Sequence, residues 1–147
     1  MISRKFIFVL SVACLFLGLN ACKSKGSSNQ TQVTTGDDNS KNSLDWSGTY
    51  SGILPCADCS GIETKLSLKS DNTYLLSWKY LEKNDEIYIQ DGTFIWDSTG
   101  TVITLKDIDK EKNPTMYKVC ENYLLQLDLE GNVVTGEIAD KYILKKD

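Results

Sequence analysis

The chain has 147 residues, with 20 acidic and 16 basic side chains, a formal net charge of −4 at pH 7 and no histidine. An acidic chain is a poor partner for nucleic acid, because phosphate backbones attract basic surfaces. The lack of histidine removes the commonest general base and the commonest metal ligand. We therefore expect a protein that neither binds nucleic acid nor acts as an enzyme.

The N-terminus has the pattern of a secretory signal peptide. Arg4 and Lys5 form a short positive segment, and residues 6–19 form an almost unbroken apolar run. This run is shorter than the ~20 apolar residues of a membrane-spanning helix, and a positive flank before a short apolar run is typical of a signal peptide. We therefore assign residues 1–21 to a signal that is removed from the mature protein.

The end of the apolar run contains a candidate lipidation site. Leu19-Asn20-Ala21-Cys22 resembles the lipobox of bacterial lipoproteins, in which the cysteine is acylated and the chain is cut before it. The resemblance implies that Cys22 anchors the protein in a membrane, since each buried CH₂ of an acyl chain contributes ~0.8 kcal/mol. Lys23 follows, and by resemblance to lipoprotein sorting a residue other than aspartate there favours the outer membrane. An ordinary secretory signal with an incidental cysteine is the alternative.

The residues after Cys22 predict a tether. Between Ser24 and Ser43 the single apolar side chain is Val33. Such a segment cannot bury enough apolar surface to offset its conformational entropy. We therefore expect residues 22–43 to be a lipidated cysteine followed by a flexible coil that holds the next domain away from the membrane.

Residues 44–147 predict one small all-β domain. Apolar and polar side chains alternate with a period of two between Ile62 and Leu68 and between Tyr74 and Tyr80. Further strands are expected at residues 46–53, 86–96 with a bend at Asp91-Gly92, 101–106, 115–120, 123–128 and 142–144. About eight strands joined mostly by short turns, with no convincing helix, favour an antiparallel meander that closes into a barrel or sandwich.

The interior of such a barrel is filled by side chains or holds one small ligand. The positions that alternate inward carry large side chains: Leu66, Leu68, Tyr74, Trp78, Phe94, Trp96 and Tyr117. We expect these side chains to form mainly a packed core. A lining for a small apolar ligand, as in a carrier protein, is the alternative.

A cysteine motif lies between the first two predicted strands. Residues 52–64 read Gly-Ile-Leu-Pro-Cys-Ala-Asp-Cys-Ser-Gly-Ile-Glu-Thr, which resembles the signature of the N-terminal domain of the NlpE family of copper-resistance and envelope-stress lipoproteins. Segments 92–96, 117–119, 121–124, 127–132 and 139–142 also look familial, so that the resemblance covers nearly all of residues 44–147. The spacing of proline, cysteines and glycines is specific, whereas a bare Cys-x-x-Cys would not be.

The resemblance implies a lipocalin-like β-barrel on a lipid anchor in the outer membrane. It also implies a role in copper tolerance and in sensing surface attachment or faulty lipoprotein trafficking, with the sensor kinase of the Cpx envelope-stress pathway as partner. Full-length family members carry a second, C-terminal domain of OB type, and we expect this chain to contain only the first domain.

Three interpretations of Cys56 and Cys59 stay open. An oxidising compartment favours a structural disulfide, which across so short a loop stabilises by only ~2 kcal/mol. Two thiolates could instead hold Cu(I), with Asp58 or Cys120 as a third ligand, and copper is the one cofactor that we consider. Redox exchange is the third interpretation. Catalysis of such exchange is not expected, because the motif lies between strands rather than at a helix N-terminus, and the charge of Asp58 disfavours a thiolate.

Cys120 lies outside the motif, in the predicted strand 115–120. It shares its strand parity with Met116 and Lys118, and Tyr117 and Val119 have the opposite parity. We therefore expect Cys120 to face outward as an incidental free thiol. An intermolecular disulfide or a contribution to a copper site are the alternatives.

Overall fold

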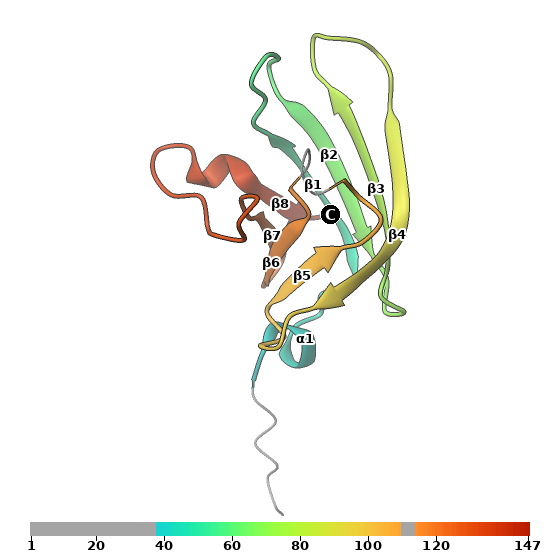
Figure 1. Ribbon diagram of the computed structural model, residues 1–147, viewed down its shortest axis with the longest axis vertical. Helices are drawn as coiled ribbons and strands as arrows, with labels where there is room; N and C mark the ends of the chain where they lie inside the picture. Colours follow the sequence, from blue (N-terminus) through green and yellow to red (C-terminus); the bar gives the residue numbers. More distant parts are fainter. Residues whose placement is uncertain (1–37, 110–113) are drawn as a thin grey trace, which may run out of the picture. The chain divides into compact units, whose positions relative to one another are not determined.

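The computed structural model describes residues 38–109 and 114–147 (Figure 1). These residues belong to one compact unit. The predicted signal peptide, the lipidation site at Cys22 and residues 23–37 of the predicted tether lie outside the described residues. Within residues 38–109 and 114–147, neither helix has the length and apolar character of a membrane span.

The described residues form a closed antiparallel barrel in which each strand pairs with its neighbours in chain order. The strands are β1 (Gly48–Leu54), β2 (Ile62–Leu68), β3 (Thr73–Tyr80), β4 (Tyr88–Trp96), β5 (Val102–Leu105), β6 (Met116–Cys120), β7 (Tyr123–Gln126) and β8 (Ile143–Lys146). The last strand pairs with the first, with Tyr50 opposite Lys146 and Ser51 opposite Lys145. This short pairing closes the ring and confirms the predicted all-β barrel of eight strands.

The alternation predicted from the sequence orients each strand. Along β2, the side chains of Thr64, Leu66 and Leu68 are buried, whereas those of Glu63 and Lys65, which point outward, are exposed or nearly so. The twist and closure of the sheet bring the inward side chains of all eight described strands together in one core. The core residues are Tyr50, Leu54, Leu66, Leu68, Tyr74, Phe94, Ile103, Leu105, Tyr117, Val119, Leu124 and Leu144.

Two of the predicted core tryptophans are only partly buried. Trp96 packs edge-on against Trp46 at a centroid distance of 5.4 Å, at the end of the barrel where β1 begins. Its indole nitrogen is buried and meets no hydrogen-bond partner among the described residues. Trp78 lies toward the opposite end, where the barrel contains a cavity. The barrel is therefore packed at one end and hollow at the other.

The ordered domain begins before Leu44, within the predicted tether. Helix α1 (Ser40–Ser43) is capped by the Asn39 side chain, which accepts a hydrogen bond from the Asn42 amide. The Ser40 hydroxyl donates to the Val119 carbonyl over 2.7 Å, and the Lys41 amide donates to the Gly100 carbonyl. Gly100 has φ +66° and lies against Asn39, so that only a residue without a side chain fits there. The polar composition of this segment did not predict that it packs on the barrel. The helix is held by hydrogen bonds and a helix cap and not by burial of apolar side chains.

Two further segments differ from the prediction. The pairing of β4 with β3 continues through Asp91 and Gly92, so these residues do not interrupt the strand. Tyr142 ends a short 3₁₀ helix, η1 (Ala139–Tyr142), and the last strand begins only at the next residue. Figure 1 shows η1 and the loop before it outside the barrel, in red.

Candidate functional site

The loop between β1 and β2, residues 55–61, contains a disulfide. The sulfur atoms of Cys56 and Cys59 are 2.02 Å apart, and the two Cα atoms are 5.3 Å apart. The structure therefore agrees with the first of the three interpretations, a disulfide between these two cysteines. Both cysteines are partly exposed, and Ala57 and Asp58 between them are exposed. A reductant or a partner protein can therefore reach the bridge from solvent.

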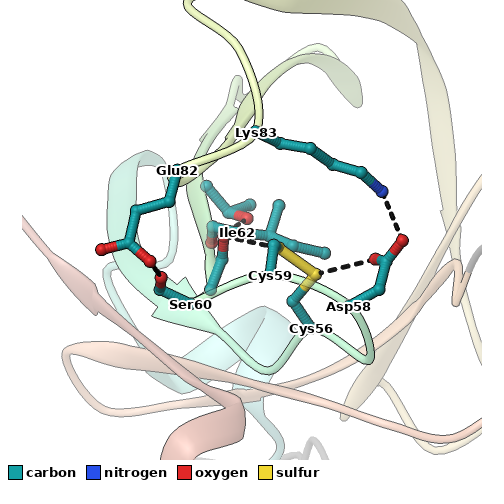
Figure 2. The surroundings of a disulfide bond; sticks show 9 residues. Cys56, Asp58, Cys59, Ser60, Ile62, Glu82 and Lys83 are labelled. Carbon is teal, nitrogen blue, oxygen red and sulfur yellow. Dashed lines mark hydrogen bonds and ion pairs between the residues drawn. A yellow bond between two sulfur atoms is a disulfide. The ribbon is translucent and has the colours of Figure 1, made fainter.

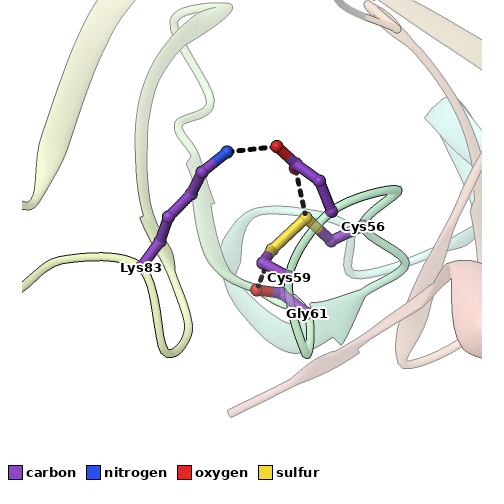
Figure 3. Close-up of polar contacts among 5 residues, drawn as sticks. Cys56, Cys59, Gly61 and Lys83 are labelled. Carbon is purple, nitrogen blue, oxygen red and sulfur yellow. Dashed lines mark hydrogen bonds and ion pairs between the residues drawn. A yellow bond between two sulfur atoms is a disulfide. The ribbon is translucent and has the colours of Figure 1, made fainter.

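Each sulfur atom has an oxygen nearby (Figures 2 and 3). The Cys56 sulfur is 3.5 Å from a carboxylate oxygen of Asp58, and the Cys59 sulfur is 3.2 Å from the Gly61 carbonyl oxygen. A disulfide sulfur carries no hydrogen, so these are contacts and not hydrogen bonds. If the bridge were reduced, each thiol would already have an acceptor within reach.

The disulfide loop is tied to the loop between β3 and β4, residues 81–87. Lys83 forms an ion pair with Asp58, and the Ser60 hydroxyl donates to the Glu82 carboxylate (Figure 2). The Leu81 amide donates to the Gly61 carbonyl over 2.9 Å. An ion pair, a side-chain hydrogen bond and a backbone hydrogen bond therefore join the two loops. We expect a conformational change in one loop to alter the other.

Lys83 changes the electrostatics that the motif alone suggests. Its hydrogen bond and its positive charge lower the pKa of Asp58 below the usual 3.8, so Asp58 is ionised at neutral pH. The same ammonium group offsets the negative charge beside the sulfur atoms, which weakens the expected effect of Asp58 on a thiolate. Sequence reasoning did not find Lys83, because it lies 25 residues from Asp58. The pairing of Ile62 with Tyr80 brings the loop before β2 close to the loop after β3. Knowledge of this register would have predicted the contact between Asp58 and Lys83.

A glycine before the motif lets the barrel close beside the loop. A Cβ atom on Gly52 would lie 2.7 Å from the Ile143 carbonyl oxygen of β8. The backbones of β1 and β8 therefore approach more closely there than a side chain would allow. This close approach explains the glycine on the N-terminal side of the motif.

The ligand atoms of Cys56, Asp58 and Cys59 all lie within 4.8 Å of one another. In the disulfide form the sulfurs cannot act as thiolate ligands. In the reduced form they would offer two soft ligands, which suit Cu(I), whereas a structural zinc site needs four ligands. Cys120 is not part of this group. It ends β6 next to Val119, whose carbonyl accepts a hydrogen bond from Ser40 of α1. The structure therefore gives no support to its alternative role as third copper ligand.

The orientation predicted for Cys120 agrees with the structure. Tyr117 and Val119 are buried in β6, and Met116, Lys118 and Cys120 are exposed or partly exposed. The thiol of Cys120 is free. It lies opposite Tyr123 in the hairpin of β6 and β7.

The disulfide loop lies at the hollow end of the barrel. A cavity of about 430 Å³ begins next to Leu54 and Pro55, which precede Cys56, and extends between the inward side chains of β2, β3, β6 and β7. Its lining includes Ile62, Leu76, Trp78, Tyr80 and Tyr117. Leu54 and Tyr117 belong to the packed core as well, so the cavity lies directly above that core.

Comparisons with known proteins point to one family. The sequence model of the family described as the NlpE N-terminal domain matches residues 50–137, a range that includes the disulfide loop. The chain is 36% identical over 91 residues to lipoprotein NlpE of Escherichia coli strain K12, an alignment that covers 60% of this chain and 37% of that protein. The chain thus spans little more than a third of the length of the curated relative it matches.

Two solved structures are similar. A candidate lipoprotein from Shewanella oneidensis is 50% identical, with a TM-score of 0.68, over 75% of this chain and 96% of that chain. The Cpx pathway activator NlpE from Escherichia coli is 30% identical, with a TM-score of 0.48, over 61% of this chain and 46% of that chain.

Proposed function

The chain belongs to the NlpE family, and we propose that it is an envelope lipoprotein. In this proposal it takes part in the response to envelope stress through contacts with other proteins and does not act as an enzyme. An E. coli relative is a Cpx pathway activator. We extend this role to the present chain, with an envelope-stress sensor protein as the partner. The observation that carries the proposal is the accessible disulfide between Cys56 and Cys59, in a loop that contacts a second loop.

The contacts between the two loops couple the redox state of the disulfide to the conformation of the second loop. Reduction would release Cys56 and Cys59 from each other and free the loop that holds Asp58 and Ser60. These two side chains bind Lys83 and Glu82, so the loop of residues 81–87 would lose its supports. We propose that this coupled change alters the surface that the partner contacts.

Exposed apolar side chains flank both loops and support a role in protein contacts. Ile53 near the end of β1 is 59% exposed, Ile87 at the end of the second loop is 63% exposed, and Ile89 near the start of β4 is 67% exposed. A surface that binds another protein commonly presents apolar side chains within a polar rim. We propose that the partner contacts these three isoleucines.

The membrane attachment of the proposed protein is a lipid anchor at Cys22 in the outer membrane. The lipobox-like Leu19-Asn20-Ala21-Cys22 and the following Lys23 support this assignment. Incorporation of labelled palmitate into the wild type, with loss of the label in Cys22→Ser, is the expected result. A labelled Cys22→Ser protein would refute the anchor.

An envelope-stress reporter tests the signalling role. We expect overproduction of the wild type to raise reporter output, and we expect Cys56→Ser/Cys59→Ser to shift that output. Cys120→Ser is the matched control, because this thiol lies at the other end of the barrel and should leave the output unchanged. Unchanged reporters upon both deletion and overproduction would refute the proposal.

Direct binding of Cu(I) is a second candidate function, and one observation favours it. The sulfur atoms of the pair and a carboxylate oxygen of Asp58 lie close enough to bind one ion after reduction. Anaerobic titration of the reduced protein with Cu(I) should show uptake that is lost in Cys56→Ser/Cys59→Ser and kept in Cys120→Ser. Equal uptake by the wild type and the double variant would remove these thiols from the site.

A further inference from the structure

The cavity at the hollow end of the barrel has the size of a small-molecule site. Its volume of about 430 Å³ lies within the ~300–1,000 Å³ of ligand pockets in proteins. The opposite end is filled by residues such as Tyr50, Leu68 and Phe94, which are at most 2% exposed. Barrels of eight strands either fill with side chains or hold one small ligand. This barrel is filled at one end and has room for one ligand at the other.

The walls of the cavity are apolar and aromatic. Leu54, Ile62 and Leu76 come from three neighbouring strands, and Trp78 adds an indole ring. Trp78 is stacked on Tyr88, with ring centroids 5.5 Å apart and ring planes 15° apart, so the indole is held in place without a ligand. A preformed apolar wall favours the apolar body of a ligand at little entropic cost.

Two buried polar side chains face this cavity. Tyr117 and Gln126 are 1% and 8% exposed, and the Gln126 amide nitrogen donates to the Tyr117 hydroxyl over 3.3 Å. In the described part of the chain, the Tyr117 hydroxyl proton meets no acceptor and the Gln126 carbonyl oxygen meets no donor. Burial raises the pKa of Tyr117 to about 12, so the phenol keeps its proton at neutral pH. The pair therefore offers at least one donor, the Tyr117 hydroxyl, and one acceptor, the Gln126 carbonyl oxygen.

The described lining of the cavity disfavours an anionic ligand. It contains the acidic side chains of Asp107 and Asp109 and, among the described residues, no lysine or arginine. The whole chain also has a formal net charge of −4. A fatty-acid carboxylate placed against Tyr117 and Gln126 would lose its hydration and would meet no cation among the described lining residues, which is costly. A hydroxyl group satisfies both Tyr117 and Gln126, since it donates and accepts.

We propose that the cavity binds one small uncharged amphiphile, with its apolar body against Leu54, Leu76 and Trp78 and a hydroxyl or amide head on Tyr117 and Gln126. This site is independent of the signalling role proposed above, because it needs neither the disulfide chemistry nor the exposed isoleucines. The ligand would lie beside the disulfide loop, whose first residue, Pro55, is part of the cavity wall.

Displacement of an uncharged fluorescent probe, N-phenyl-1-naphthylamine, tests the site. The protein is the full chain with Cys22→Ser, so that no acyl chain of its own competes for the cavity. We expect saturable binding of one probe per chain, displacement by 1-decanol, and displacement by decanoate only at higher concentration. Absence of saturable binding, or tighter binding of decanoate than of 1-decanol, would overturn the proposal.

Two variants locate the ligand. Tyr117→Phe should weaken 1-decanol binding roughly threefold to tenfold, the effect of one lost hydrogen bond. Tyr50→Phe is its matched control, because this buried phenol donates to the Trp46 carbonyl at the packed end and should leave binding unchanged. Thr64→Phe should fill the cavity and abolish binding, with circular dichroism as the check on folding. If Tyr117→Phe and a folded Thr64→Phe both bind as the wild type does, the ligand is not in this cavity.

Discussion

Lys83 in the loop between β3 and β4 forms an ion pair with Asp58, which lies between the two cysteines of the disulfide. The two residues of the pair are 25 positions apart in the chain and lie in two different loops. The pair places a positive charge beside the carboxylate that contacts the Cys56 sulfur (Figure 3). We therefore expect a residue outside the motif to influence the reactivity of its thiols.

Removal of this ammonium group should slow the reaction of the reduced thiols. In Lys83→Met the charge of Asp58 is no longer offset, and a negative charge next to Cys56 disfavours the thiolate that reacts. We expect alkylation of the reduced protein by iodoacetamide at pH 7 to slow by roughly twofold to fivefold, the range for an exposed charge pair. Cys120→Ser serves as the background, so that only the motif reacts.

Lys79→Met is the control for this experiment. Lys79 forms an exposed ion pair with Asp85, 2.7 Å long, and is not bonded to the disulfide loop. Its loss should leave the alkylation rate unchanged. Equal slowing in both variants would show that net charge, and not the contact with Asp58, controls the thiols.

Loss of the disulfide should lower stability modestly without unfolding the barrel. The bridge closes a loop with a sequence separation of 3, and the entropy of so small a loop corresponds to about 2 kcal/mol. Urea unfolding of Cys56→Ser/Cys59→Ser should show this loss in the free energy of unfolding, and the reduced wild type should match the variant. Complete loss of the fold would contradict the assignment of the core to the barrel interior.

The turn between β4 and β5 should make the protein sensitive to acid. The carboxylate of Asp97 accepts hydrogen bonds from the Thr99 hydroxyl and from the Thr101 and Val102 amides. Burial raises the pKa of Asp97, but these hydrogen bonds lower it by more, to below the usual 3.8. A lowered folded-state pKa gives stability that is present above pH ~3.8 and is lost as pH falls through the folded value.

Asp97→Asn isolates this effect. At pH 7 the variant should be less stable than the wild type by under about 1 kcal/mol, because the site is largely exposed to solvent. The difference should shrink as the pH falls below 3.8 and the wild-type carboxyl becomes protonated. Thermal unfolding from pH 7 to pH 2.5 measures it, and a difference that stays constant over this range would rule out ionisation as the cause.

The docked helix α1 should contribute to stability although the sequence predicts a tether there. Ser40→Ala removes the hydrogen bond to the Val119 carbonyl, and Asn39→Ala removes the helix cap. Each should lower the free energy of unfolding by about 1 kcal/mol. Ser43→Ala, an exposed change in the same helix, should have no measurable effect. Wild-type stability in the first two variants would mean that the domain begins at Leu44, as predicted.

Local sequence patterns are enough to predict the strands, the direction of most side chains and the family. Alternation of the kind seen from Ile62 to Leu68 is a property of neighbours in the chain, because successive side chains of a strand point to opposite faces. The cysteine motif is also a local feature, because it is recognised from consecutive residues without knowledge of how the strands pair. The parity that turns Cys120 outward follows from the same rule.

Tertiary structure decided which of these local features meet. The register of β2 and β3 brings Lys83 to Asp58, and the closure of β1 on β8 separates Cys120 from the motif and leaves a cavity at one end of the barrel. These outcomes depend on pairings between residues that are up to 18 positions apart in β2 and β3 and more than 90 positions apart in β1 and β8. A one-residue shift in such a pairing would reverse the faces of a whole strand, and no window of neighbouring residues records it.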